Sequence, residues 1–149
     1  MERISEKSKQ VLASFLGSQK LAVLSTYSAG QPYLSLVAFA VTGDLDRLLF
    51  VTDRSTRKFA NILEHPRIAM LVDNRSNRES DFSEASAATF LGEARELVGR
   101  ERDAQLRVYL NKHPSFEGFA ASAKCAVIQL EVETVILVDG FSVLQDCLR

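Results

Sequence analysis

The sequence is poor in the residues that usually carry protein chemistry, with two cysteines, two histidines, three prolines and no tryptophan among 149 residues. Cys125 and Cys147 stand far apart and form neither a disulfide framework nor a CxxC motif, which favours a reducing cytoplasm. No apolar run approaches the roughly 18 residues of a membrane span, and the charged start lacks the apolar stretch of a signal peptide. We therefore expect a cytoplasmic protein with no membrane partner.

Both histidines stand directly before a proline, in Glu64-His65-Pro66 and Lys112-His113-Pro114. A residue before proline is disfavoured in the helical conformation, and a cationic side chain suits a helix C-terminus, so each histidine is interpreted as a helix end. The spacings of a Ser-His-Asp triad, a zinc site, a P-loop and a GxGxxG loop are all missing from the sequence. If the protein performs chemistry, we expect the reactive group to come from outside the chain.

The charges are almost balanced, with 18 Lys and Arg against 19 Asp and Glu. Binding to nucleic acid phosphates needs a basic excess across the domain, so nucleic acid is not expected as a partner, and any basic site must be local. The length suits one domain over residues 1–149 that buries a core without disulfides or a structural metal.

Hydrophobic periodicity divides the chain into short elements. It predicts helices over residues 5–16, 55–64 and 100–112, and strands over residues 21–27, 33–41, 47–52, 67–73, 86–98, 125–132 and 134–138. Gly92 lies inside a predicted strand and indicates a bulge or bend, and residues 74–81 form a polar loop. Several short strands with few helices predict an α+β fold, namely a mostly antiparallel sheet or barrel.

One cluster of cations and hydroxyls lies where the strand over residues 47–52 meets the next helix. Its members are Thr52, Arg54, Ser55, Thr56, Arg57 and Lys58. A helix N-terminus offers unpaired N–H groups and the positive end of a dipole, so this cluster can form a phosphate site. The alternative is a solvated helix start with Asp53 or Ser55 as the N-cap. Cations in the first turn oppose the dipole at a cost of up to about 1 kcal/mol unless an anion neutralises them, which favours the phosphate site.

The residues around this junction resemble the FMN-binding split-barrel family typified by pyridoxamine 5′-phosphate oxidase. The resemblance rests on Gly30-Gln31-Pro32-Tyr33 with the apolar strand that follows, and on the run from Val51 to Leu71. It implies an α+β fold with a mostly antiparallel split β-barrel and a few flanking helices. It also implies bound FMN and a homodimer with the cofactor at the subunit interface.

The resemblance assigns residues to three parts of the cofactor. It implies that Arg57, Lys58 and Ser55 bind the phosphate, and that Val51 and Thr52 line the flavin and the ribityl chain. It also implies backbone hydrogen bonds to the edge of the ring from Ser35, Leu36, Val37 and Ala38. No catalytic residue and no metal ligand is assigned.

The sequence departs from the vitamin oxidase at several positions. Ser35 and Ala40 replace an arginine and a lysine that bind phosphates, and Ala87 stands near the position of a glutamine that touches the flavin. An arginine and a histidine near the oxidase C-terminus have no match in residues 139–149. We therefore expect an FMN-dependent oxidoreductase with an unknown small-molecule electron donor or acceptor, and not the pyridoxamine oxidase reaction.

Two further alternatives stay open at this stage. The protein could hold flavin, deazaflavin or haem without turnover, since Gly140-Phe141 resembles haem-utilisation members of the family more weakly, and the candidate haem ligands are His65, His113, Met70 and Tyr109. The loop over residues 74–78 is either a solvated surface loop or carries Arg75 or Arg78 toward the flavin of a partner subunit. Whether the protein is an enzyme is therefore left open.

Overall fold

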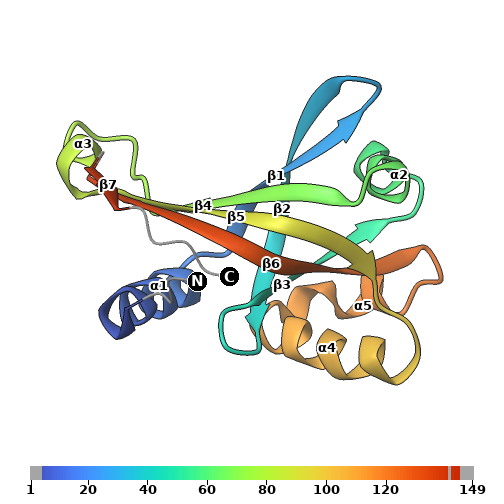
Figure 1. Ribbon diagram of the computed structural model, residues 1–149. Helices are drawn as coiled ribbons and strands as arrows, with labels where there is room; N and C mark the ends of the chain where they lie inside the picture. The colour runs from blue at the N-terminus through green and yellow to red at the C-terminus, as the bar shows by residue number, and fades with distance from the viewer. Residues whose placement is uncertain (1–4, 141, 145–149) are drawn as a thin grey trace.

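The computed structural model describes residues 5–140 and 142–144, and the strands in this part of the chain form one antiparallel sheet (Figure 1). The strands are β1 (Leu21–Ser28), β2 (Gln31–Thr42), β3 (Arg47–Asp53), β4 (Arg67–Asp73), β5 (Ser86–Glu96), β6 (Cys125–Asp139) and β7 (Ser142–Leu144). Their order is β3-β2-β1-β4-β5-β6-β7, and a further pairing of β3 with β6 closes the first six strands into a barrel. The predicted α+β fold with a mostly antiparallel split barrel is confirmed.

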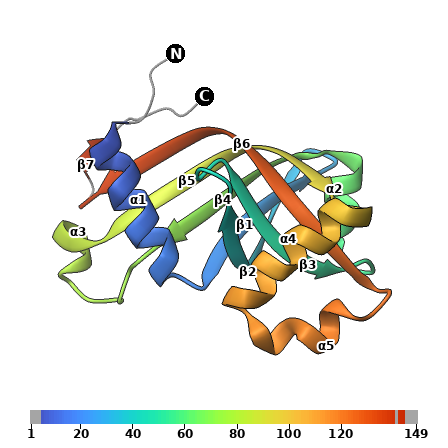
Figure 2. The ribbon, with the colours of Figure 1, turned by 90° about the horizontal axis from the view of Figure 1, so that it is seen from below.

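The helices flank this barrel, and Figure 2 shows α1 and α4 lying across its strands. They are α1 (Glu6–Ser18), α2 (Arg57–Glu64), α3 (Asp81–Glu84), α4 (Gly99–Lys112), the 3₁₀ helix η1 (Pro114–Phe116) and α5 (Glu117–Ala120). His65 and His113 are the C-caps of α2 and α4, which confirms their interpretation as helix ends. In the described residues, no helix is long and apolar enough to cross a membrane.

The expected break between two strands at the end of the chain is wrong, because residues 125–139 form the single strand β6. The register along β5 explains the error. Leu91 pairs with Thr134 but Gly92 pairs with Val132, so Glu133 is the extra residue of a β-bulge. The bulge predicted at Gly92 is thereby confirmed, and a Cβ atom at Gly92 would stand only 1.9 Å from the Glu131 carbonyl oxygen.

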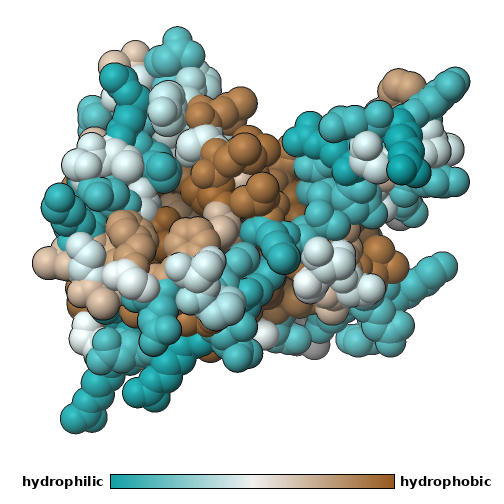
Figure 3. Space-filling view, turned by 180° about the vertical axis from the view of Figure 1, so that it is seen from behind, coloured by the Kyte–Doolittle hydropathy of each residue, from teal (hydrophilic) through white to brown (hydrophobic). Residues whose placement is uncertain are grey.

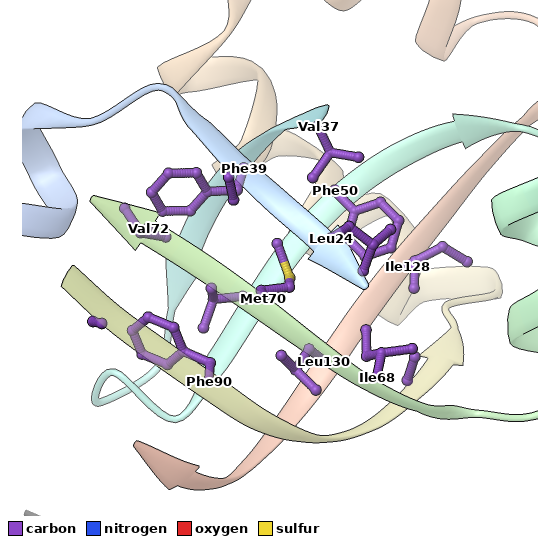
Figure 4. Packing of buried hydrophobic residues seen from close by; sticks show 14 of the residues in the cluster. Leu24, Val37, Phe39, Phe50, Ile68, Met70, Val72, Phe90, Ile128 and Leu130 are labelled. Carbon is purple, nitrogen blue, oxygen red and sulfur yellow. The ribbon is translucent and has the colours of Figure 1, made fainter. Parts of the chain in front are cut away.

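The main hydrophobic core fills the barrel, where large side chains from several strands meet (Figure 4). Leu24, Phe50, Met70 and Phe90 are all fully buried there, and α1 closes the cluster with Leu12, Phe15 and Leu16. A second cluster lies outside the barrel wall, between β3, β6 and α4, and includes Leu49, Val51, Tyr109, Cys125 and Val127. Cys147 lies outside the described residues.

The barrel is split because the pairing of β2 with β3 is short. The pairing of β2 with β3 runs only from Thr42–Arg47 to Phe39–Phe50. The β1–β2 hairpin pairs on to Ser28–Gln31 and projects away from the barrel, as Figure 1 shows. Between residues 31 and 38, β2 therefore pairs with β1 alone among the described strands, which leaves one edge of β2 open.

Candidate functional site

The α2 helix begins at Arg57, directly after β3 and beside the open edge of β2. Its N-cap is Thr56, whose hydroxyl accepts a hydrogen bond from the Phe59 N–H at 3.4 Å. The expectation of Asp53 or Ser55 as the N-cap is wrong. Both residues belong to a turn before the helix, in which the Ser55 N–H and hydroxyl donate to the Asp53 carboxylate at 2.8 and 2.7 Å.

Hydrogen bonds fix α2 against two strands. The Thr52 and Thr56 hydroxyls lie 2.9 Å apart, and the Thr56 hydroxyl donates to the Asp53 carbonyl at 2.8 Å. Farther along α2, the buried Asn61 amide donates to the Thr26 hydroxyl of β1 at 3.0 Å. The first turn of α2 is therefore held in place relative to both β1 and β3.

Arg57 and Lys58 are the first two residues of α2, and neither forms an ion pair with a carboxylate of the described chain. The Arg57 guanidinium lies over the Tyr33 ring of β2, 5.8 Å from its centroid. Tyr33 was not among the predicted site residues, although it belongs to the Gly30–Tyr33 motif that carries the resemblance. The contact joins the start of α2 to the open strand.

Arg54 differs from the other two cations of the cluster because its guanidinium is already used. It pairs with Glu96, donates to the Ala123 carbonyl at 3.3 Å and lies 5.6 Å from the centroid of the Phe59 ring. These contacts tie the end of β3 to β5, to the loop before β6 and to α2. Arg54 is therefore a structural residue, and the capacity to bind an anion rests with Arg57 and Lys58.

A carboxylate lies near this cationic pair. The hydrogen bonds from Ser55 lower the pKa of Asp53, with a smaller contribution from the charges of Lys124 and Lys58, so the side chain is ionised at neutral pH. The hydroxyl of Ser55 would have to leave Asp53 before it could donate to a phosphate. One carboxylate offsets only part of the charge of Arg57 and Lys58.

The backbone of β2 alternates between its paired side and its open side. The Phe39 N–H donates to the Lys20 carbonyl on the side of β1, at 3.2 Å. In an antiparallel strand the N–H and C=O of one residue point to the same side, and this side alternates from residue to residue. The N–H and C=O groups of Leu36 and Ala38 therefore point to the open edge. Of the four residues predicted to bind a ring edge through their backbones, these two carry the groups that point outward, while those of Ser35 and Val37 face β1.

The side chains of the predicted ring-edge residues alternate in the same way. Val37 is buried in the barrel and Leu36 is 66% exposed on the outer face. Ser35 also faces inward, and its buried hydroxyl oxygen has no hydrogen-bond partner among the described residues. The Val51 side chain packs into the second hydrophobic cluster against α4, away from the solvent.

The outer face of β2, β1, β4 and β5 is apolar and exposed, and Figure 3 shows apolar side chains gathered in the hollow between the β1–β2 hairpin and the α3 segment. Leu36, Val23, Leu71 and Thr89 face outward in one row across the four strands. A hollow of about 800 Å³ adjoins this row, with Leu71, Ala87, Thr89 and Val138 among its strand residues, and Arg75, Arg78 and Phe82 among its loop and helix residues. Ala87, which stands near the position of the flavin-contacting glutamine of the oxidase, therefore lines this hollow.

The arginines of the loop before α3 differ in their contacts. The Arg75 guanidinium pairs with Asp73 at 2.9 Å, whereas Arg78 forms no ion pair with the described residues. The loop is shaped by the Asp81 carboxylate, which accepts backbone N–H groups from Ser76, Asn77 and Arg78. These hydrogen bonds lower the pKa of Asp81.

The candidate haem ligands are not gathered at one place. Met70 is fully buried in the barrel core, and Tyr109 is fully buried in the cluster beneath α4. His113 is also buried and its Nε2 atom lies 2.7 Å from the Phe39 carbonyl oxygen. His65 is partly exposed, and its ring meets that of Tyr27 edge to face at 5.1 Å.

Solved structures with the same fold differ in what their names say they bind. A heme binding protein from Mycobacterium smegmatis is 20% identical with a TM-score of 0.81, and the match covers 99% of this chain but only 59% of that one. A FAD-binding protein from Mesorhizobium loti is 19% identical, with a TM-score of 0.69 and coverage of 90% and 94%. At these identities the likeness shows the fold alone.

A third structure links the fold to a named family. It is a protein from Clostridium acetobutylicum related to general stress protein 26 of Bacillus subtilis and assigned to the pyridoxinephosphate oxidase family. It is 13% identical, with a TM-score of 0.76 and coverage of 97% of each chain. No curated protein matches the sequence.

The family model for pyridoxamine 5′-phosphate oxidase matches residues 8–139, which include the whole barrel from β1 to β6. The resemblance first found around Arg57 and Lys58 therefore extends over most of the chain. With the closed six-strand barrel, the open edge of β2 and this match in sequence, the chain belongs to the pyridoxamine 5′-phosphate oxidase family.

Proposed function

We propose that this protein is a cytoplasmic FMN-binding flavoprotein, one split-barrel domain over residues 1–149, and that it acts as a flavin-dependent oxidoreductase on a small-molecule donor or acceptor. The observation that carries the proposal is the pair Arg57 and Lys58, which forms no ion pair with a carboxylate of the described residues and stands at the N-terminus of α2, where Arg57 contacts Tyr33 of the open strand β2. Cations at that end of a helix oppose its dipole, so an anion is the partner that they lack.

The phosphate of FMN would lie at the first turn of α2. Arg57 offers a planar set of N–H donors and Lys58 offers an ammonium group, while the N-terminus of the helix adds backbone N–H groups and its dipole. Ser55 can contribute its hydroxyl once it turns from Asp53. Arg54 would stay with Glu96 and hold the loop in shape.

The flavin ring would lie along the open edge of β2, where the peptide groups of Leu36 and Ala38 point outward. A flat ring requires apolar walls and a few fixed donors and acceptors, which an apolar strand edge supplies. Val51 and Thr52 would border the ring and the ribityl chain from the end of β3. The buried Ser35 hydroxyl, which has no hydrogen-bond partner in the part of the chain that the structure describes, is a further candidate contact. Bound flavin would supply the electron transfer, while the chain binds and orients it.

A second copy of this chain is the proposed cover for the apolar outer face. Leu34 and Leu36 are each 66% exposed there, and contiguous exposed apolar side chains of this kind typically mark an interface. In a twofold dimer the same face is used by both subunits, so the hollow beside Ala87 would meet the edge of the partner's β2. Arg78, which has no ion pair in the described chain, could then reach the partner's flavin.

The alternative with specific support is a haem-binding protein that has no turnover, because one similar structure is named as a heme binding protein. The chain spans 59% of the length of that protein, and of the four candidate ligands only His65 is more than slightly exposed. The propionate carboxylates of haem would also pair with Arg57 and Lys58, so this cationic pair alone does not distinguish haem from FMN. A deazaflavin cofactor would use the same phosphate site and the same strand edge as FMN.

The visible spectrum of the purified protein tests these readings directly. We expect flavin absorption bands, or their appearance after FMN is added and excess ligand removed, together with quenched flavin fluorescence. A Soret band with no FMN uptake would support the haem alternative. A colourless protein that takes up neither FMN nor haem would refute both. Turnover needs a separate assay, in which the loaded protein is offered a panel of nicotinamide and organic donors.

A further inference from the structure

Two side chains of α4 bind consecutive carbonyl groups of β2. The Tyr109 hydroxyl donates to the Ala38 carbonyl at 3.2 Å, and the His113 Nε2 atom lies 2.7 Å from the Phe39 carbonyl oxygen. A carbonyl oxygen only accepts hydrogen bonds, so Nε2 of His113 carries a proton. Tyr109 and His113 are separated by one turn of α4, which lets both reach the same short stretch of β2.

These two carbonyls lie where β2 separates from β3. Phe39 is the last residue of β2 that pairs with β3, through Phe50, and Ala38 is the first residue toward the open edge. From there to Gln31, β2 has strand hydrogen bonds on one side only. The Ala38 carbonyl points to the side that β3 has left, so Tyr109 replaces the missing strand where the open edge begins. The Phe39 carbonyl points to the side of β1, like the Phe39 N–H, so His113 holds the same stretch of β2 from that side.

Packing holds the two side chains in position. Tyr109 is fully buried and His113 is nearly so, and their rings lie 5.0 Å apart between centroids. The Phe116 ring meets both, at 5.8 and 5.9 Å, nearly perpendicular to each. Burial raises the pKa of Tyr109 above its usual value, so the phenol keeps its proton and stays a donor.

The hydrogen bond from Tyr109 also decides what the edge presents. With the Ala38 carbonyl occupied, the groups that remain at this end are the Leu36 N–H, the Leu36 carbonyl and the Ala38 N–H. This is a donor, acceptor, donor series along the strand. It complements a ring edge that presents a carbonyl, an N–H and a second carbonyl, as the pyrimidine part of a flavin does and haem does not.

We propose that Tyr109 and His113 are positioning residues of the cofactor site, which fix the start of the open edge of β2 so that it reads the pyrimidine edge of a flavin ring. This proposal rests on the proposed function. Neither residue touches the flavin; both act through the backbone of Ala38 and Phe39. The role is separate from that of Arg57 and Lys58, which concern the phosphate.

The test compares flavins with and without a phosphate. Tyr109→Phe keeps the ring and removes only the hydroxyl, so we expect riboflavin and FMN to bind about three- to tenfold more weakly, with a shifted flavin absorption spectrum. Tyr27→Phe is the control, because Tyr27 is a partly exposed tyrosine whose ring contacts His65 outside α4. It should leave both affinities and the spectrum unchanged.

His113 is tested by rescue. His113→Gln keeps a side-chain N–H donor for the Phe39 carbonyl and His113→Leu does not, so the glutamine variant should retain more of the riboflavin affinity than the leucine variant. The flavin-free protein gives a second readout, since hydrogen exchange of the Phe39 amide, which donates to Lys20, should become faster in Tyr109→Phe and in His113→Leu.

The outcomes separate this proposal from the one on which it rests. If Tyr109→Phe leaves riboflavin affinity, the spectrum and β2 amide exchange unchanged, the positioning role is refuted while FMN binding stands. If the wild-type protein binds no flavin, the proposed function fails and the role in reading a flavin edge fails with it. Faster exchange in the variants would then show only that α4 braces β2.

Discussion

Replacing both Arg57 and Lys58 by alanine should abolish most of the affinity for FMN without harming the fold. A hydrogen bond to a charged group contributes about 1.5–3 kcal/mol, and two of them would contribute about 3–6 kcal/mol. Arg57 is exposed and Lys58 is half-buried, so solvent screening favours the lower end of this range. A loss of about 3 kcal/mol corresponds to a dissociation constant more than 100-fold weaker.

The same double variant should be at least as stable as the wild type when no cofactor is bound. The two cations stand in the first turn of α2 and form no ion pair with a carboxylate of the described chain, so they oppose the helix dipole at a cost of a few tenths to about 1 kcal/mol each. A thermal unfolding curve of the flavin-free protein checks this. A gain or no change in stability combined with a loss of affinity distinguishes a ligand site from a structural pair.

Titration of FMN and riboflavin by fluorescence quenching completes the assay. Riboflavin lacks the phosphate, so its affinity should not change in the double variant, and raising the salt concentration should weaken FMN binding only in the wild type. Arg100→Ala with Arg107→Ala removes the same charge from exposed positions of α4 and should leave both affinities unchanged. An FMN affinity equal to that of the wild type, or an equal loss for riboflavin, would refute the assignment.

Three further predictions concern the barrel, the outer face and the half-buried amine of Lys112. Gly92→Ala places a methyl group 1.9 Å from the Glu131 carbonyl oxygen and should lower the free energy of unfolding by about 2 kcal/mol or more. Gly118→Ala is the control, because a methyl group there would have nothing within 4 Å. Equal denaturation midpoints for the two variants would contradict the prediction. Leu36→Glu should convert the proposed homodimer to a monomer in sedimentation experiments, since it puts a charge on the apolar outer face. A dimer that persists would place the interface elsewhere. Burial lowers the pKa of Lys112 to about 8, from an ordinary value of 10.5. Between pH 8 and pH 10.5 the unfolded chain therefore binds more protons than the folded protein, and the free energy of unfolding should rise with pH. Lys112→Met should lose this rise in denaturant titrations, and a rise that survives the substitution would contradict the prediction.

Much of the fold follows from the sequence because its signals are local. Apolar periodicity locates most of the strands, and a proline after each histidine marks a helix end. Gly92 marks the bulge, because the Glu131 carbonyl lies too close for any residue with a Cβ atom. The core of the candidate phosphate site is just as local. Arg57 and Lys58 are adjacent in the sequence and lie in one helical turn, so a motif suffices to find them.

Other features depend on partners far away in the chain, and only the tertiary structure decided them. Glu133 separates two strands in the sequence pattern, yet it is a bulge within β6, because β5 pairs on both sides of it. Arg54 and Arg57 are alike in sequence, but Glu96 of β5 occupies the first and leaves the second free for an anion. Tyr109 reads as a core residue of α4, and only folding brings its hydroxyl to the β2 carbonyl where the open edge begins. Periodicity predicts whether a side chain faces the core or the solvent. Which residues that side chain contacts depends on which strands and helices the fold brings together.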